Sequence, residues 1–201
     1  MDSLEQFGDI DIYLFDQLLR RRLVPGMRVL DAGCGRGRNL TYLLRAVYEV
    51  FAIDADPGAV EVVRELAAHL APHLPAANFR AEPLESMSFP DACADAVICS
   101  AVLHFARDDH QFDAMLNGAW RTLRHGGVFF ARLASSIGME QRVQRMDGRR
   151  YLLPDGSQRY LVDEALLLAH TRRLRGELLD PIKTTVVQDQ RCMTTWVMRK
   201  T

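Results

Sequence analysis

Lysine is nearly missing from this chain, since only Lys183 and Lys200 stand among its 25 basic residues. The net charge is −1, so the basic excess typical of nucleic-acid-binding proteins is also absent. No apolar run approaches the roughly 20 residues of a membrane-spanning helix, and residues 1–13 are acidic and polar, unlike a signal peptide. We therefore expect a cytoplasmic protein that binds neither nucleic acid nor membrane.

Cysteine is also sparse. The four cysteines, Cys34, Cys93, Cys99 and Cys192, form neither a metal-ligand spacing nor a dense disulfide framework, so we expect reduced thiols and no metal site. By contrast, 48% of the 201 residues are hydrophobic and 25% are charged, an ordinary globular composition. A chain of this length can bury a substantial core. We expect one domain over residues 1–201, as a monomer or a homodimer.

Hydrophobic periodicity predicts helices and strands in alternation. Residues 11–23 carry apolar side chains at helical spacing and end at Pro25 and Gly26. Short apolar runs then predict strands at 27–32, 50–53, 78–81, 96–99 and 128–131, with helical patterns at 40–47, 57–70 and 109–123. These crossovers are long enough to join parallel strands. The order predicts an α/β fold with a doubly wound, mostly parallel sheet and helices on both faces.

The last third of the chain has a different pattern. Residues 138–160 are rich in arginine and contain a turn sequence at 154–156 between two short apolar segments. A helix is expected near residues 162–173. Two β-rich runs, 182–187 and 193–198, are separated by only a few polar residues, which predicts an antiparallel hairpin at the edge of the sheet.

The most informative stretch is VLDAGCGRGRN at residues 29–39. Its glycines follow a predicted strand and permit a tight turn that a ligand can approach closely. A dinucleotide site would place a third glycine at position 38, which is Arg38 here, and Asp31 would repel a pyrophosphate. An acid at position 31 instead suits a ligand with positive charge. A turn that serves only strand–helix packing is the alternative.

Asp54 ends the second predicted strand, about twenty residues after the glycines, where an acid can accept hydrogen bonds from both hydroxyls of a ribose. Helix capping is the alternative role for Asp54. However, Asp56 stands directly before Pro57 and is better placed to cap the following helix.

These stretches resemble the class I S-adenosylmethionine-dependent methyltransferases. VLDAGCGRGRN is similar to the first motif of that family and AIDADPGAV to the second. SFPDACADAVICSAVLHF is similar to the segment through the fourth strand, and TLRHGGVFFARL to the turn into the fifth, with His125 replacing the usual proline. GRN and MTTWVMRK resemble small bacterial tellurite-resistance-type methyltransferases, and the middle of the chain resembles enzymes of ubiquinone and menaquinone biosynthesis.

The resemblance implies a Rossmann-like, seven-stranded sheet with an antiparallel C-terminal strand. It also implies a capping helix within residues 1–25, a substrate-recognition insertion at 138–161, and S-adenosylmethionine as the cofactor. By this resemblance Gly33, Cys34 and Gly35 would line the methionine end of the cofactor. Asp31 would set the electrostatics there, and Asp54 would hold the ribose.

The other end of the implied site departs from the family pattern. Ala55 and Leu84 would border the adenine with their backbone, and Ser100 would lie below the reacting methyl group. The family's acid for the adenine amino group aligns with Pro83 here. Either Glu82, one residue earlier, takes that role, or water or backbone does.

Methyl transfer from an activated sulfonium depends mainly on in-line placement of the acceptor, and a base is needed only if the acceptor must lose a proton. His104, after the fourth predicted strand, is the first candidate for a base, and Tyr13 on the N-terminal helix is the second. A histidine packed against the next helix is the alternative for His104.

Five arginines outnumber the acids between residues 142 and 159, namely Arg142, Arg145, Arg149, Arg150 and Arg159. Guanidinium groups suit carboxylates and phosphates, so we expect a small anionic acceptor held by Arg149 and Arg150. A solvated surface in an arginine-biased protein is the alternative. The competing functions are a non-catalytic S-adenosylmethionine-binding or sensor protein and an NAD-dependent oxidoreductase.

Overall fold

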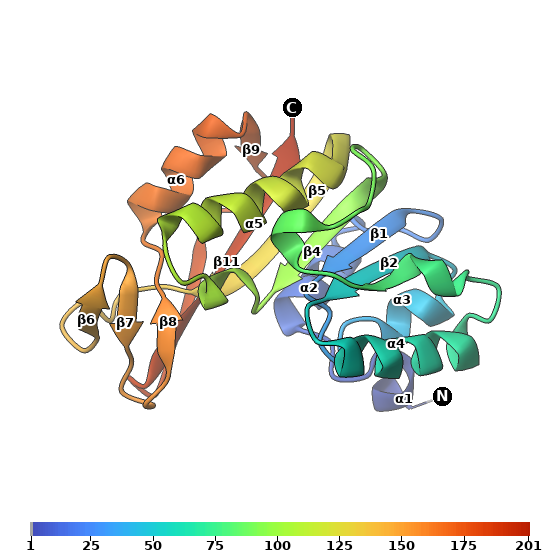
Figure 1. Cartoon of the computed structure of the whole chain (residues 1–201), viewed down its shortest axis with the longest axis horizontal. Coiled ribbons are helices and arrows are strands. Elements are labelled where there is room, and N and C mark those ends of the chain that lie inside the picture. The colour runs from blue at the N-terminus through green and yellow to red at the C-terminus, as the bar shows by residue number, and fades with distance from the viewer. Residues whose placement is uncertain (1) are drawn as a thin grey trace.

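The computed structural model describes residues 2–201 and shows one large twisted sheet and one small sheet (Figure 1). The large sheet has the order β3-β2-β1-β4-β5-β11, and both β9 and β10 pair with the outer edge of β11. Its strands are β1 (Arg28–Ala32), β2 (Glu49–Asp54), β3 (Phe79–Ala81), β4 (Ala94–Ser100), β5 (Leu123–Ala134), β9 (Gly176–Leu178), β10 (Lys183–Val187) and β11 (Arg191–Lys200).

Strands β1 to β5 pair in parallel, whereas β11 runs antiparallel to β5. The eight strands described for this sheet fill seven positions, because β9 and β10 follow each other along one edge. The predicted seven-stranded, mostly parallel sheet with an antiparallel C-terminal strand is confirmed. So is the predicted edge hairpin, in which Thr184 lies opposite Thr194.

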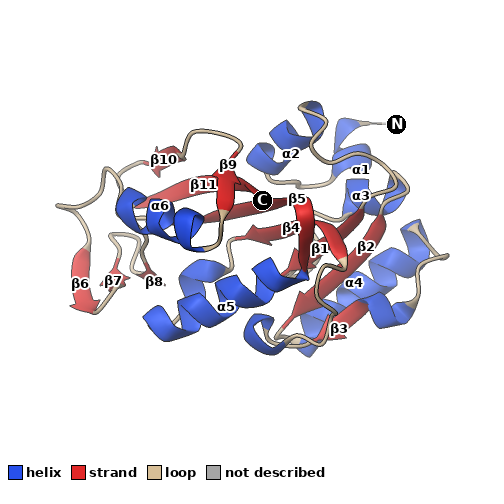
Figure 2. Ribbon diagram, turned by 90° about the horizontal axis from the view of Figure 1, so that it is seen from above, coloured by secondary structure: helices blue, strands red, loops and turns tan. Residues whose placement is uncertain are grey.

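Helices cover both faces of the large sheet, as predicted, and Figure 2 shows α2 and α5 on opposite sides. One face packs on α2 (Ile12–Leu19), α3 (Thr41–Arg45) and α4 (Pro57–Leu70), and the other on α5 (Asp109–Thr122) and α6 (Glu164–Arg173). Neighbouring strand residues alternate between these cores: Val29 faces the first group and Leu30 the second. Among residues 2–201, no helix is long and apolar enough to cross a membrane.

The N-terminal segment holds two helices where one was predicted. A short α1 (Ser3–Phe7) precedes α2, and Gly8 separates them with a φ of +60°, which interrupts helical geometry. Short 3-10 turns, η1 (Ala76–Asn78), η2 (Leu84–Ser86) and η3 (Leu103–Phe105), complete the loops around the sheet.

The arginine-rich segment forms the small antiparallel sheet of β6 (Gln144–Asp147), β7 (Arg150–Leu152) and β8 (Gln158–Tyr160). The turn predicted at 154–156 joins β7 to β8. Strand β6 was not predicted, because all four of its residues are exposed and it lacks the alternation that marks a half-buried strand.

Candidate functional site

Strand β1 runs directly into the glycine turn. The backbone N–H groups of Gly33 and Cys34 both donate to the carbonyl of Ile53, at 2.8 Å each. Gly33 has a φ of +92°, and a Cβ atom there would stand 2.4 Å from a methyl group of Val102, so only glycine fits. Gly35 also has a positive φ, +51°, but a Cβ there would meet no atom within 4 Å. The turn therefore leaves open space over Gly35.

The carboxylate of Asp54 ties this turn to the end of β2. One oxygen accepts from the N–H of Gly35 at 2.8 Å and the other from the N–H of Asp56 at 2.9 Å. Asp56 itself caps α4 by accepting from the N–H of Gly58, as its position in the sequence predicts. Because Asp54 is only half-buried, its remaining lone pairs can accept from hydroxyl donors of a ligand.

A cavity of about 590 Å³, which we call the first cavity, opens over the glycine turn at the carboxyl ends of the strands. This is where ligands bind in doubly wound sheets. Of the nine residues that the sequence suggests for the cofactor, eight line the cavity: Gly33, Cys34, Gly35, Asp54, Ala55, Glu82, Leu84 and Ser100. The structure thus brings together residues at or just beyond the carboxyl ends of β1, β2, β3 and β4.

Asp31 is the ninth and lies behind the lining. It is 1% exposed, and neither carboxylate oxygen has a hydrogen-bond partner among the described residues. Burial and the neighbouring Asp54 raise the pKa of Asp31 to about 7, against the opposing effect of Arg38. A buried, unpaired carboxylate is unfavourable, so a positively charged ligand in this cavity would be stabilised by Asp31.

Glu82, Pro83 and Leu84 line the first cavity beyond β3. The carboxylate of Glu82 accepts from the N–H of Ser88 at 2.7 Å and from its hydroxyl at 2.6 Å. Partial burial opposes ionisation, but these bonds and Arg80 lower the pKa of Glu82 overall. An ionised carboxylate is therefore present one residue from the position where the family's acid aligns, and Ser88 holds it in place.

Asp11 connects the N-terminal helix to the cavity, although the sequence did not single it out. Its side chain is 2% exposed and lies 2.9 Å from Arg38 and 3.1 Å from Arg132. The hydroxyl of Ser100 donates to the same carboxylate at 3.5 Å. Asp11 also caps α2 by accepting from the N–H of Tyr13, so an acid directly before the first helical pattern was the signal for it.

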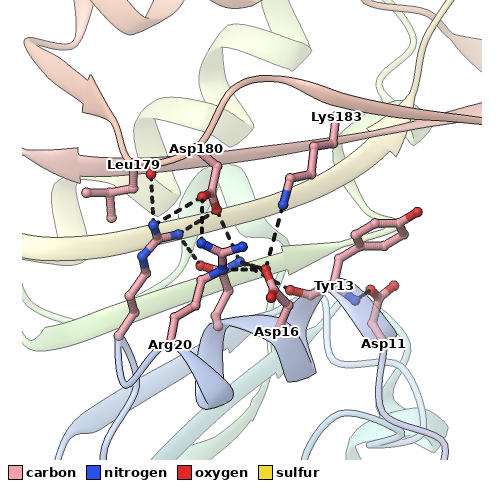
Figure 3. Close-up of polar contacts among 9 residues, drawn as sticks. Asp11, Tyr13, Asp16, Arg20, Leu179, Asp180 and Lys183 are labelled. Carbon is pink, nitrogen blue, oxygen red and sulfur yellow. Dashed lines mark hydrogen bonds and ion pairs between the residues drawn. The ribbon is translucent and has the colours of Figure 1, made fainter.

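The rest of α2 is anchored on the C-terminal strands rather than in the cavity. Arg22, just beyond the helix, donates to both carboxylate oxygens of Asp180 and to the carbonyl of Leu179. Figure 3 shows Asp180 and Lys183 facing Arg20 and Asp16 of this segment. The hydroxyl of Tyr13 lies 2.5 Å from that of Thr185 in β10. Tyr13 does not line the first cavity or the second cavity described below. This candidate base instead joins α2 to β10.

A second cavity of about 310 Å³ adjoins the first, and the two share Arg38, Ala101 and Phe105 in their linings. Four arginines line it: Arg38, Arg132, Arg159 and Arg191. Asp155 is the carboxylate in the lining, and Asp11 lies behind two of the arginines. The second cavity is therefore electropositive. Its backbone includes Ala101, which has a φ of +63° and whose N–H donates to the carbonyl of Arg132 at 2.7 Å.

His104, the first candidate base, lines the second cavity. Its Nδ1 accepts a hydrogen bond from the backbone N–H of Ala134 at 3.1 Å, and the side chain is 5% exposed. Burial, Arg159 and Arg132 lower its pKa to about 4. The imidazole is therefore neutral at pH 7.

Arg149 and Arg150 line neither cavity. Arg149 pairs with Asp163 at 2.9 Å, at the start of α6, and Arg150 donates to the carbonyl of Ala106 at 3.2 Å. Of the five arginines in the 142–159 segment, Arg159 is the one that lines the second cavity. The sequence identified the arginine-rich segment but not which side chain points inward.

No group of three or more His, Cys, Asp or Glu side chains among residues 2–201 is placed to hold a metal ion. Cys34, in the glycine turn, is a buried free thiol, and burial together with Asp31 and Asp54 raises its pKa.

A family model described as a methyltransferase domain matches residues 30–131, from the middle of β1 through most of β5. The chain belongs to the class I S-adenosylmethionine-dependent methyltransferases. The matched segment covers half of this chain and includes the glycine turn, Asp54 and the segment through β4, whereas MTTWVMRK at residues 193–200 lies outside it. It leaves out the N-terminal helices, the small sheet and the edge hairpin.

Two curated relatives are named as O-methyltransferases. Malonyl-[acyl-carrier protein] O-methyltransferase of Serratia marcescens is 32% identical over 132 residues, which is 64% of this chain and 48% of the relative. A ubiquinone biosynthesis O-methyltransferase of Methylocella silvestris is 34% identical over 110 residues, 55% of this chain and 41% of the relative. The chain thus spans about half the length of the curated relatives it matches.

A solved structure matches almost the whole chain. The 1,6-didemethyltoxoflavin-N1-methyltransferase of Burkholderia thailandensis covers 96% of this chain, with a TM-score of 0.71, 21% identity and 80% of that chain covered. Its crystals contained 1,6-didemethyltoxoflavin and S-adenosylhomocysteine. At this identity the likeness establishes the fold.

Proposed function

We propose that this protein transfers a methyl group from S-adenosylmethionine to a small, negatively charged acceptor. The observation that carries the proposal is a pair of adjoining cavities with opposite electrostatic character. The first cavity has the glycine turn, Asp54 and the unpaired Asp31. The second is lined by four arginines and opens onto the first at Ala101 and Phe105.

The residues of the first cavity fit the cofactor. The open space over Gly35 admits a ligand against the backbone, Asp54 can accept from ribose hydroxyls, and Asp31 supplies a negative charge that has no protein partner. When bound, S-adenosylmethionine supplies an electrophilic methyl group on a positively charged sulfur. The chain's own contribution is then to orient the acceptor in line with that methyl group.

The insertion at 138–161 supports an acceptor site in the second cavity. Its β7–β8 hairpin contributes Leu153, Asp155, Ser157 and Arg159 to the lining. In this proposal Arg149 and Arg150 act indirectly, because their contacts with Asp163 and Ala106 fix the small sheet beside the cavity.

Calorimetric titration with S-adenosylmethionine, S-adenosylhomocysteine and NADH tests the cofactor assignment. We expect both sulfur compounds to bind and NADH not to bind. Asp54→Ala should weaken both at least about tenfold, because it removes the hydroxyl acceptor and releases the N–H groups of Gly35 and Asp56. Asp91→Ala is the matched control, since Asp91 is an exposed aspartate that pairs with Arg121 and lines neither cavity.

Binding of neither sulfur compound would refute the proposal. Tight binding without turnover of any acceptor would favour the non-catalytic alternative, a protein that senses S-adenosylmethionine. Binding of NADH that depends on Asp54 would instead favour an oxidoreductase.

A further inference from the structure

The second cavity combines many hydrogen-bond donors with few groups able to take up a proton. Arg159 forms no ion pair among the described residues, although it and Arg191 lie close enough to Asp155 to help lower the pKa of that carboxyl group. Arg159 donates to the carbonyl of Gln158 and lies over the ring of Phe105 at 4.9 Å. Arg191 likewise forms no ion pair in the part of the chain that the structure describes. The Nε of Arg132 is buried without a partner.

The hydrogen bond to His104 decides which ring nitrogen carries the proton. Because Nδ1 accepts from the N–H of Ala134, the neutral ring must carry its hydrogen on Nε2. Nε2 has no partner among the described residues and is not sealed inside the protein, and the side chain lines the second cavity. A second proton would have to sit on Nδ1, against the N–H of Ala134 and close to Arg132 and Arg159. His104 can therefore donate to a ligand but cannot accept its proton.

The unpaired carboxylate of Asp31 lies behind the lining of the first cavity and lines neither cavity. The carboxylates that do line the two cavities are all occupied. Each carboxylate accepts from protein donors: Asp54 from the N–H groups of Gly35 and Asp56, Glu82 from Ser88, Glu85 from Gln111, and Asp155 from Ser157. The bonds from Ser157 lower the pKa of Asp155, which makes it a weak base. The thiol of Cys34 donates to the carbonyl of Gly35, and its raised pKa keeps it protonated.

We propose that the acceptor presents an oxyanion that is already ionised in solution, and that His104 and Arg159 bind it as donors without any side chain removing a proton. A carboxylate and an acidic phenol or enol share this chemistry. An alcohol or an ammonium group does not, because each must lose a proton to become a nucleophile. The proposal rests on the function proposed above and specifies its acceptor.

The reaction balances without a base. The acceptor oxyanion forms a bond to the methyl carbon while the bond from that carbon to sulfur breaks, and the electron pair of that bond remains on sulfur. The positive charge of the sulfonium and the negative charge of the oxyanion cancel, and no proton moves. Arg159 and the Nε2–H of His104 hold the acceptor, so their removal should raise the KM for the acceptor more than it lowers kcat.

The first experiment measures binding, with benzoate as the probe and benzamide as its neutral counterpart. Calorimetry on the protein saturated with S-adenosylhomocysteine should detect benzoate and not benzamide. Arg159→Gln should weaken benzoate binding about tenfold or more. Arg145→Gln, an exposed arginine of the same small sheet that lines neither cavity, should leave it unchanged. Equal binding of benzoate and benzamide, or equal effects of the two variants, would overturn the proposal.

The second experiment follows release of S-adenosylhomocysteine with saturating S-adenosylmethionine and a panel of carboxylates, substituted phenols, alcohols and amines. For carboxylates, kcat/KM should be flat from about pH 5.5 to about pH 9, because they are ionised throughout. For phenols, the pH at which kcat/KM reaches its plateau should follow the pKa of each phenol. A limb that stays at one pH for every acceptor would reveal an enzyme base and refute the proposal, as would turnover confined to alcohols or amines.

Variants of His104 separate donation from packing. His104→Gln keeps an N–H donor and should retain benzoate binding, whereas His104→Leu should lose it. The wild-type pH profile keeps the proposal testable if the leucine variant does not fold. If the wild type does not bind S-adenosylhomocysteine, the proposed function itself fails. The cofactor titration detects that failure separately.

Discussion

Replacing Asp31 by asparagine removes a buried carboxylate whose two oxygens have no partner among the described residues. Its pKa is raised from an ordinary value of 3.8 to about 7. A shift of about three units, at 1.36 kcal/mol each, means that ionised Asp31 costs the folded, ligand-free protein about 4 kcal/mol. The side chain is fully buried, so solvent does not screen this cost away.

The sign of the pH dependence follows from proton uptake. Between pH 3.8 and about 7, the folded state holds a proton on Asp31 that the unfolded state has lost, so stability falls as pH rises through this window. The cost is about 1.5 kcal/mol at pH 5 and complete above pH 7. The free energy of unfolding of Asp31→Asn, relative to the wild type, should therefore rise by about 2.5 kcal/mol between pH 5 and pH 8.

Urea titrations of both proteins at the two pH values measure this difference. Comparing variant with wild type cancels the titration of every other group, and the cost of burying the new amide is the same at both pH values. A difference that does not change between pH 5 and pH 8 would refute the assignment of a raised pKa to Asp31.

The same carboxylate should couple cofactor binding to pH. A cation in the first cavity favours ionised Asp31, so below pH 7 binding of S-adenosylmethionine releases a proton and weakens by up to about tenfold per pH unit. Calorimetry in two buffers of different ionisation enthalpy measures the released proton. Asp31→Asn should release none and bind S-adenosylmethionine more weakly at pH 8. Proton release by the variant equal to that of the wild type would place the titrating group elsewhere.

Two further predictions concern stability and are checked by urea unfolding. Gly33→Ala should lower the free energy of unfolding by several kcal/mol, because its Cβ would stand 2.4 Å from a neighbouring side chain at a positive φ. Gly26→Ala, at a φ of +89° but in open space, should lower it by only about 1 kcal/mol. Tyr13→Phe and Thr185→Val should each cost about 1 kcal/mol, and the double variant should cost about 1 kcal/mol less than their sum, since one hydrogen bond joins them. Full additivity of that pair would mean that the contact contributes nothing.

The large sheet was predictable because its signals are local. Helix α4 has the predicted bounds, since Asp56 caps it and Pro57 occupies the first helical position. Buried parallel strands are short apolar runs, so β1, β2 and β4 were found, and the long crossovers determined their direction. Strand β6 was not predicted because all of its residues are exposed, so its sequence shows no alternation of apolar and polar residues.

The first cavity was predictable for a related reason. Its lining residues follow the carboxyl ends of consecutive parallel strands, and parallel pairing brings those ends to one edge of the sheet. The second cavity gathers residues far apart in the chain, such as Arg38, Arg132 and Arg191. Their proximity depends on the order of strands in space and on the orientation of the small sheet, neither of which is encoded in a local pattern.

The tautomer of His104 also depends on tertiary structure, because the N–H that it accepts belongs to Ala134, thirty residues away. The sequence placed a histidine near the methyl group and suggested a base, whereas the hydrogen bond from β5 makes its free nitrogen a donor. Residue type alone therefore could not decide whether His104 accepts a proton or donates a hydrogen bond. The partner of its Nδ1 atom decides this.

The two cavities together suggest how the charges assist turnover. Asp31 and Asp54 favour a cation on one side, and Arg159 and Arg191 favour an anion on the other. In the proposed reaction these two charges cancel, so the attraction of the site is greatest for the reactants and smaller for the products. An arginine that stabilises the oxyanion before it reacts contributes to binding rather than to the barrier. In this proposal the acceleration must then come from placing the oxyanion in line with the methyl group. The junction of the two cavities at Ala101 and Phe105 is where the two reactants would meet.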